Sequence, residues 1–348
     1  MNVPKLRFKE FNDEYVKLKY KDVLKIKSGK DQKQVENKNG KYPILGTGGQ
    51  IGKTNSFLYD KPSVLIGRKG TINKPQYMES PFWTVDTLFY SHIYEPNIPK
   101  YLFYSFQNVN WKKYDESTGV PSLSSSTIEN VECNIPSPNE QIKVANFLSL
   151  LDKKIELQTK KIEDLKLFKL SKYSSVFSKS NNKIKLSDIC IIEKGKQINS
   201  DLLIEKGNYY MLNGGILPSG YLNEYNTNEN TITISEGGNS CGYVNFNKTK
   251  FWCGGHCYKI ISSSVNSSYL YHLLKHNEKI IMDLRVGSGL PNIQKKDLEA
   301  LKLSIHKNDE QLKIGILFDT FDKKINLETE KLNKFKELKK ALMQVMFV

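Results

Sequence analysis

Residues 140–169 read EQIKVANFLSLLDKKIELQTKKIEDLKLFK, and residues 310–339 repeat them as EQLKIGILFDTFDKKINLETEKLNKFKELK. Aligned without gaps at an offset of 170 residues (310 minus 140), the two copies share twelve identities in thirty positions. Most of the other pairs exchange one apolar residue for another. Each copy follows a longer and more divergent segment, so the sequence predicts an internal pseudo-twofold repeat.

Both copies carry apolar residues at heptad a and d spacing, with a polar residue at one matched place. This predicted helix seam comprises Leu148, Leu151, Ile155, Gln158, Ile162, Leu165, Phe318, Phe321, Ile325, Glu328, Leu332 and Phe335. A helix of about 38 residues spans roughly 57 Å, and a stripe of that length needs a long partner. We therefore expect two long helices packed as an antiparallel coiled coil. The alternative is that each helix folds onto its own module.

The divergent segments share landmarks in the same order, for example YPILGTGG at 42–49 and YYMLNGG at 209–215. Strand-like runs, including one from Trp83 to Tyr90, alternate with glycine-rich turns. The predicted fold class is α/β (α+β): two globular domains of mixed β-sheet plus short helices, joined by the two long helices. We predict domains at 1–138 and 181–307, and long helices at 139–180 and 308–348.

The composition favours a polyanionic partner, because the net charge is +15 and the pI is about 9.3. A lysine bias typical of AT-rich genomes weakens this indication, since only Arg7, Arg68 and Arg285 are arginine. The sequence has no run of eighteen apolar residues and no apolar signal segment, which excludes a transmembrane helix and a signal peptide. Five irregularly spaced cysteines indicate reduced thiols and a cytoplasmic location.

Two motifs resemble catalytic or metal sites. Residues 47–54, TGGQIGKT, end like a P-loop, but the first glycine of that motif is replaced by Thr47 and no helix pattern follows. Residues 253–257, CGGHC, could bind zinc together with Cys241, yet their spacing matches no zinc knuckle and the first domain lacks them. We interpret these motifs as a glycine-rich turn and buried thiols, and we predict no catalytic residue and no metal site.

Basic, glycine-rich loops on each domain are the places where bases could be read. Arginine and lysine can recognise guanine, asparagine adenine, and glutamate cytosine, while lysine also contacts phosphates. The candidate DNA-binding residues are Lys53, Thr54, Asn55, Arg68, Lys69, Asn73, Asn213, Tyr221, Asn223, Glu236, Asn239, Lys248 and Arg285.

The chain resembles the DNA-specificity (S) subunit of type I restriction–modification enzymes. The resemblance rests on a G-x-P element (119–121 and 289–291), a Glu-Gln helix start (140–141 and 310–311) and an Asp-Lys-Lys-Ile run (152–155 and 322–325). It also includes the strand-turn Ile66–Gly70, which the second domain replaces with Ser235-Glu236-Gly237-Gly238.

The resemblance implies two target-recognition domains, each reading one half of a bipartite double-stranded DNA site. It implies that the helix pair sets the spacer and docks methyltransferase (M) subunits, two of them in the expected complex, with restriction (R) subunits joining through them. S-adenosylmethionine, ATP and Mg would belong to those partners, and this chain would need no cofactor. Two alternatives remain: a zinc- or nucleotide-dependent nucleic-acid hydrolase, and a fragment of a single-chain restriction–modification enzyme.

Overall fold

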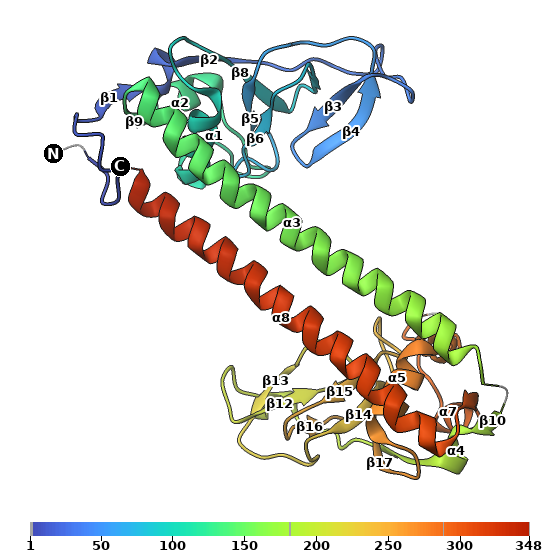
Figure 1. The fold of residues 1–348 in the computed structure, drawn as a ribbon. Helices are drawn as coiled ribbons and strands as arrows, with labels where there is room; N and C mark the ends of the chain where they lie inside the picture. Colours follow the sequence, from blue (N-terminus) through green and yellow to red (C-terminus); the bar gives the residue numbers. More distant parts are fainter. Residues whose placement is uncertain (1–2, 181, 288, 348) are drawn as a thin grey trace. The chain divides into compact units, whose positions relative to one another are not determined.

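The computed structural model describes residues 3–180, 182–287 and 289–347, and it divides into two compact units. Unit 1 comprises Met1–Thr159 and Glu330–Val348, and unit 2 comprises Lys160–Thr329. The long helices α3 (Pro138–Phe177) and α8 (Asn308–Met346) each contribute to both units (green and red in Figure 1). Because both helices are divided between the units, this division does not test our sequence-based domain limits, which stay predictions. Residue 181, where the predicted second domain begins, lies outside the described residues.

Unit 1 contains a four-stranded antiparallel sheet, a three-stranded sheet and a two-stranded sheet. In sheet order the four-stranded sheet is β2 (Leu24–Lys27), β8 (Leu88–Ile93), β5 (Ser63–Gly67) and β6 (Gln76–Met78). The three-stranded sheet is β4 (Gly49–Thr54), β3 (Tyr42–Gly46) and β7 (Trp83–Thr84). β1 (Val16–Lys19) pairs with β9 (Glu132–Ile135), and α1 (Pro99–Asn108) and α2 (Ser125–Asn130) complete the unit.

Unit 2 has the same sheet topology in the same chain order. Its four-stranded sheet is β11 (Cys190–Lys194), β17 (Cys257–Ser263), β14 (Thr231–Ser235) and β15 (Val244–Asn247). Its three-stranded sheet is β13 (Gly220–Leu222), β12 (Tyr209–Leu212) and β16 (Trp252–Cys253). β10 (Asn182–Lys185) pairs with β18 (Lys302–Ile305). The helices are α4 (Leu186–Ile189), α5 (Ser267–His276), α6 (Glu278–Met282) and α7 (Lys295–Glu299).

The predicted single strand from Trp83 to Tyr90 is wrong, because the chain forms two strands in different sheets. β7 ends at Thr84, and a turn follows in which the amide of Leu88 donates to the carbonyl of Val85 at 3.0 Å. β8 then begins at Leu88. β-branched residues continue through the turn at 84–87, so strand propensity alone did not reveal it.

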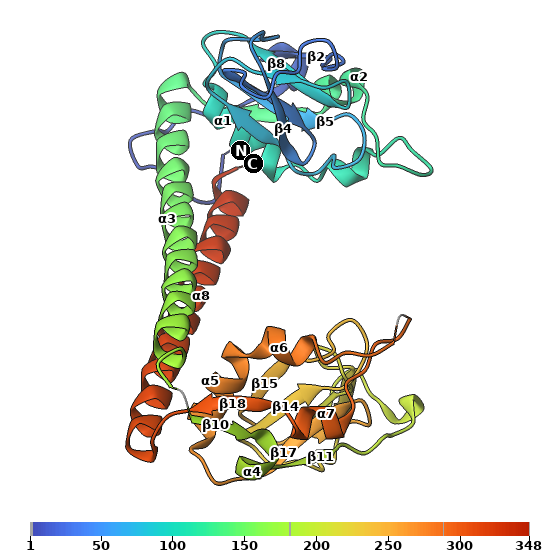
Figure 2. The same cartoon turned by 90° about the vertical axis from the view of Figure 1, so that its right-hand side faces the viewer.

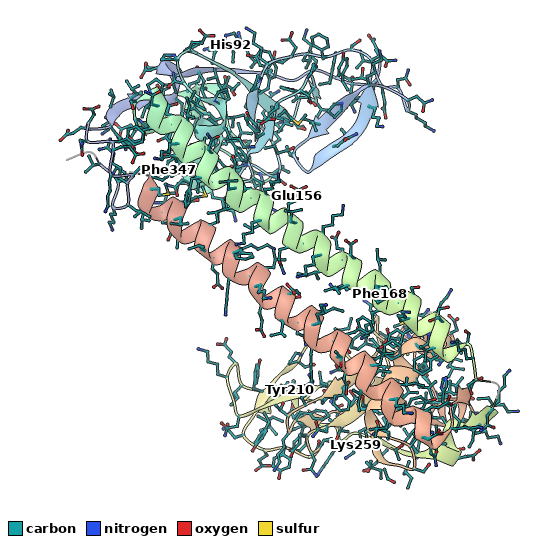
Figure 3. All side chains as sticks on the ribbon, in the orientation of Figure 1. His92, Glu156, Phe168, Tyr210, Lys259 and Phe347 are labelled. Carbon is teal, nitrogen blue, oxygen red and sulfur yellow. The ribbon has the colours of Figure 1, made fainter. Side chains whose placement is uncertain are left out.

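Each unit has its own apolar core, and each core includes the ends of the long helices. In unit 1 the core contains Trp111, Tyr101 and Phe347, and in unit 2 it contains Tyr269 and Phe177. Phe347, labelled in Figure 3, stacks on Tyr101 with ring centroids 5.3 Å apart. Phe177, which precedes Phe347 by the repeat offset of 170, contacts Tyr269 at 6.0 Å. Burying such aromatic side chains contributes about 1.5–3 kcal/mol each, which holds both helix ends on the globular parts.

Within each unit, a stretch of α3 lies antiparallel beside a stretch of α8 (Figures 1 and 2). In unit 1 the Nζ of Lys339 lies 2.6 Å from Asp152, and in unit 2 the Nζ of Lys169 lies 2.5 Å from Asp322. The repeat offset of 170 relates Lys339 to Lys169 and Asp152 to Asp322, so the two pairs are the same contact with the helices exchanged. These four residues are identities of the repeat, so the repeat preserved one interhelical contact in both units.

The predicted seam residues are all buried or half-buried in their own unit. Leu148 and Phe318 are completely buried, and Leu332 is 8% exposed. The matched polar position is buried at Glu328, whose Oε1 accepts a hydrogen bond from the Nζ of Lys161 at 2.8 Å. The ammonium group of Lys161 compensates the buried charge of Glu328, which stands at a seam position that an apolar residue would otherwise occupy.

The glutamines of the Glu-Gln helix starts explain why that motif is kept. The Nε2 of Gln141 donates to the carbonyl of Pro136, and the Nε2 of Gln311 donates to the carbonyl of His306, both at 3.0 Å. Each bond ties the preceding chain to the first turn of its helix. The glutamates differ, because Glu140 is buried and bound by Arg7, while Glu310 is exposed.

The predicted fold class is confirmed: two mixed α/β globular parts, long helices and an internal repeat. No helix within residues 3–180, 182–287 and 289–347 has the length and apolar character needed to cross a membrane.

Candidate nucleic-acid interface

The turn after β5 is shaped by two glycines and by a segment fifty residues later. Gly70 has φ +88°, and a Cβ on Gly67 would meet the carbonyl oxygen of Thr71 at 2.3 Å. The amide of Gly70 donates to the carbonyl of Pro121 at 2.8 Å, and the amide of Leu123 donates to the carbonyl of Arg68 at 2.9 Å. The G-x-P element therefore lies directly beside the strand-turn that carries Arg68.

Unit 2 builds the same frame with different side chains. The amide of Gly238 donates to the carbonyl of Pro291 at 3.1 Å, and the amide of Ile293 donates to the carbonyl of Glu236 at 2.8 Å. Gly238 also has a positive φ, +75°. Glu236 thus occupies the backbone position that Arg68 occupies in unit 1. The repeat has kept the main-chain scaffold and reversed the charge on it.

Arg68 and Lys69 present exposed cations at this turn in unit 1, and Asn73 is exposed just beyond it. The described contact of the Arg68 guanidinium is a long one, 3.5 Å from Nη1 to the carbonyl of Asp86. Within the described residues no carboxylate pairs with Arg68. Its fork of donors is free for a guanine edge or a phosphate.

The other unit 1 candidates lie on or just after β4. Lys53 and Asn55 are exposed there. Thr54 is completely buried, and its Oγ1 accepts a hydrogen bond from the amide of Ser56 at 3.0 Å. Strand alternation thus turns Thr54 into the core and away from the surface on which Lys53 and Asn55 are exposed. The P-loop resemblance is explained as well, since residues 52–54 lie inside a strand.

Among the unit 2 candidates other than Glu236, five are exposed and one is half-buried. The exposed ones are Tyr221, Asn223, Asn239, Lys248 and Arg285. Asn213 is half-buried, and its Oδ1 accepts from the amide of His256 at 3.1 Å. Lys248 lines a cavity of about 310 Å³ with Asp319 and Asp322 of α8. The structure thus joins Asn213 to the Glu236 turn and places Lys248 at a different site.

Glu236, which we predicted as a possible acceptor for cytosine, is mostly buried. Its side chain is 12% exposed and turned inward, with Oε1 2.6 Å from the Nζ of Lys194 and 3.1 Å from the hydroxyl of Tyr258. Oε2 is buried without a hydrogen-bond partner, and Nδ1 of His256 lies 3.6 Å from it. Burial, and next the charge of Glu236, raise the pKa of Tyr258, so its hydroxyl stays a donor.

Lys194 and His256 were missed as DNA-binding candidates, since His256 had been considered only within the possible zinc motif at 253–257. Lysine and glutamate are so frequent in this sequence that the Glu193–Lys194 pair carried no signal by itself. The usable signal was topological: Lys194 ends β11, Glu236 follows β14 and His256 precedes β17. These strands are neighbours in one sheet, in the order β11-β17-β14. Their ends meet at one sheet edge, which a strand assignment alone could not reveal.

A basic cavity of about 850 Å³ opens in unit 1 between the loop after the Arg68 turn and the last turns of α8. Its lining includes Lys74, Lys336 and Lys340, together with Asn73 and Asn110. No ion pair is described for these three lysines among the residues that the structure covers. A cavity with uncompensated ammonium groups and amide donors is suited to an anion such as a phosphodiester.

The cysteines do not form a reactive or metal-binding centre in the described structure. All five are free and buried. Burial raises the pKa of the Cys133 and Cys190 thiols to about 12, and a hydrogen bond with Cys253, followed by burial, raises that of Cys257. Within the described ranges no group of three potential metal ligands occurs. Protonated, buried thiols are poor nucleophiles.

The long helices leave matched apolar residues on their surfaces. Leu157 is 59% exposed, and Leu327, its identical counterpart in the repeat, is 57% exposed. Ile142 and Leu312 form a second exposed apolar pair at the same offset. The same helix positions are thus apolar and exposed in both copies of the repeat.

The family model described as "Type I restriction modification DNA specificity domain" matches residues 12–167 and again 179–337. A putative type I specificity subunit from Mycoplasma pneumoniae is 34% identical over 161 residues, which is 45% of this chain and 42% of that protein. The chain thus aligns with less than half of that relative's length. The MjaIX specificity subunit from Methanocaldococcus jannaschii is 24% identical over 332 residues, covering 82% of this chain and 77% of the relative.

Two solved structures share the fold. A type I restriction–modification S subunit from M. genitalium has a TM-score of 0.74 and 20% identity, with 99% of each chain covered. A chain from a type I restriction–modification system, studied for complex assembly and conformational transition, has a TM-score of 0.57 and 14% identity, covering 94% of this chain and 96% of that one.

Proposed function

The chain belongs to the family of type I restriction–modification DNA specificity subunits, and we propose that each of its two globular parts reads one half of a bipartite DNA site. The observation that carries this proposal is the duplicated turn and G-x-P frame, which presents Arg68 in one unit and Glu236 in the other. An identical scaffold with different side chains suits two readers of different sequences. Exposed lysines nearby supply phosphate contacts.

The proposed role is non-catalytic. Methylation and cleavage would be performed by partner subunits that bind S-adenosylmethionine, ATP and Mg, and this chain would hold no cofactor of its own. Burial raises the pKa of the Cys133 and Cys190 thiols to about 12, which makes them poor nucleophiles and is in keeping with this role. The position of Gly52-Lys53-Thr54 inside β4 disfavours nucleotide hydrolysis. We place the activity in the cytoplasm, where host DNA and reduced thiols coexist.

Two methyltransferase subunits would dock on the exposed apolar residues that the repeat preserves, one around Leu157 and one around Leu327. Two equivalent surfaces on one chain require two copies of the same partner. Restriction subunits would join through this complex. Because α3 and α8 are continuous over 40 and 39 residues, the helix pair would also set the spacing between the half-sites.

The function is tested by producing the chain with a methyltransferase subunit and sequencing methylated bases in the DNA they modify. We expect methylation at a bipartite motif and none when this chain is omitted. Methylation without this chain, or ATP or DNA hydrolysis by the purified chain alone, would contradict the proposal.

A further inference from the structure

In unit 2 a buried carboxylate holds two exposed nitrogen groups at one sheet edge. Lys194 and His256 are 51% and 63% exposed at their side chains, while Glu236 between them is 12% exposed. Tyr258 fixes the carboxylate from below through its hydroxyl, at 3.1 Å. A lysine is normally a flexible point charge, but a 2.6 Å contact with an inward-facing carboxylate limits where its ammonium group can lie.

The members of this cluster differ from the residues at the equivalent backbone positions of unit 1. The main-chain bonds equate Glu236 with Arg68, because Glu236 donates its amide to the carbonyl of His256 as Arg68 does to that of Thr87. His256 therefore occupies the backbone position in unit 2 that Thr87 occupies in unit 1. The strand register equates Tyr258 with Phe89, since these residues pair with Ile234 and Ile66. Unit 1 thus has Arg68, Thr87 and Phe89 at the backbone positions where unit 2 has Glu236, His256 and Tyr258.

We propose that Lys194 and His256 are the base-contacting pair of the second domain, and that Glu236 is a positioning residue that aims them. The ligand is the hydrogen-bond-accepting edge of a base, the O6 and N7 of guanine in the major groove. Lys194 donates from Nζ, and His256 donates from Nε2 in its imidazolium form. Glu236 does not contact the base, because both of its oxygens face the protein interior.

Phosphate offers the same acceptor chemistry, but the geometry favours a base. A phosphate contact needs charge without fixed direction, and the exposed lysines elsewhere provide it. Here a carboxylate, a tyrosine and an imidazole are arranged to fix a direction, at the backbone position where unit 1 presents a free arginine. The Nδ1 of His256 lies 3.6 Å from the unpartnered Oε2 of Glu236. An imidazolium donates from both ring nitrogens, so Nδ1–H faces this carboxylate while Nε2–H is the donor to the base.

The inference rests on the proposed function, and the test separates the two. The full chain is assembled with its methyltransferase subunit, and methylated motifs are mapped for the wild type and for Lys194→Gln, Glu236→Gln and His256→Gln. Failure of the wild type to give a bipartite motif overturns the proposed function. With the wild-type motif in hand, we expect Lys194→Gln and Glu236→Gln to relax the same base position of one half-site, by about tenfold in preference, and to leave the other half-site unchanged.

Two control variants make the result specific. Arg68→Gln should relax the opposite half-site only. Glu193→Gln removes a neighbouring carboxylate that lies 3.8 Å from Lys259, and it should leave the motif unchanged. Thermal unfolding of each variant shows whether a loss reflects folding. If Glu236→Gln unfolds, Lys194→Gln decides the matter, because it truncates an exposed side chain.

Two outcomes overturn the inference. One is an unchanged motif in Lys194→Gln and His256→Gln. The other is a uniform loss of methylation at all sequences without any change in base preference, which would assign the pair to a phosphate. Substituting 7-deazaguanine at the relaxed position provides a second readout: it should weaken the wild type and have little further effect on Lys194→Gln.

Discussion

At the scale of single residues, the repeat is most informative where it conserves pairs. Asp152 with Lys339 and Asp322 with Lys169 are the same contact made once in each unit. Both lysines are largely buried, at 14% and 13% exposure, so water screens these pairs less than ordinary surface ion pairs. The hydroxyl of Tyr104 adds a hydrogen bond to Asp152 at 2.7 Å. Twelve identities had shown that the copies were related, but only the structure shows which identities meet.

We expect Asp152→Asn and Asp322→Asn each to lower the free energy of unfolding by about 1 kcal/mol, because each leaves a largely buried lysine without its carboxylate. Urea denaturation measures this. Glu156→Gln is the control, since Glu156 is exposed on α3 and no ion pair is described for it (Figure 3). Equal effects in all three variants would show that the pairs contribute nothing specific.

A second residue-scale prediction concerns acid stability in unit 2. Burial lowers the pKa of His272 and of His276. Around His272, the hydroxyl of Tyr173 and the carboxylate of Asp319 bond its ring nitrogens. Burial is the largest effect on its pKa; the bond with Asp319 raises the pKa, and the charge of Lys169 lowers it. The unfolded chain therefore binds more protons than the folded one, so stability is lost as pH falls through the unfolded value near 6.5.

We expect unit 2 to unfold at a lower temperature at pH 5.5 than at pH 7.5. His276→Phe should reduce this difference, because it keeps the ring contact with Phe177 and removes a titrating group. Circular dichroism melts at both pH values measure the effect. A melting temperature that is the same at both pH values would contradict the inference that folding lowers the pKa of His272 and His276.

At the scale of elements, periodicity predicted the long helices well and the sheet edges poorly. The seam from Leu148 to Phe335 follows from a local rule, because one helix face repeats every 3.6 residues. The break between β7 and β8, the burial of Thr54 and the inward turn of Glu236 depend on which strands become neighbours. That pairing is long-range and is not written in any single window of sequence. Hence the turn carrying Arg68 was recognised, whereas Lys194 and His256 were not.

The exposed leucines give an element-scale prediction about partner binding. Leu157→Lys and Leu327→Lys should each reduce the number of methyltransferase subunits bound per chain from two to one, because each places a charge in one apolar docking surface. Native mass spectrometry counts the subunits. Leu167→Lys is the control: Leu167 is 64% exposed on the same helix, but its repeat counterpart is the charged Glu337. Retention of two subunits by both test variants would remove this surface from the proposal.

At the scale of the whole molecule, one chain contains two copies of a globular part and two copies of a long helix. The sheet orders β2-β8-β5-β6 and β11-β17-β14-β15 show that the two globular parts share a topology, and their turns show that they differ in side-chain chemistry. Sequence could predict this duplication, because landmarks survive in order. It could not predict the bases, because recognition depends on loop side chains whose directions are set by long-range packing.

The helix pair leads to a further prediction at this scale. Deleting one heptad from both α3 and α8 should shorten the spacer between the half-sites or abolish binding, because about 10 Å of helix would be lost at 1.5 Å per residue. Mapping of the methylated motif measures the spacer. An unchanged spacer in a folded deletion variant would contradict the idea that the helices set it.

The most direct test of the central claim exchanges residues 15–138 for the corresponding domain of another family member and maps the methylated motif. If each domain reads one half-site independently, the hybrid changes one half of the motif and preserves the other half. A motif that changes in both halves, or in neither, would contradict that claim.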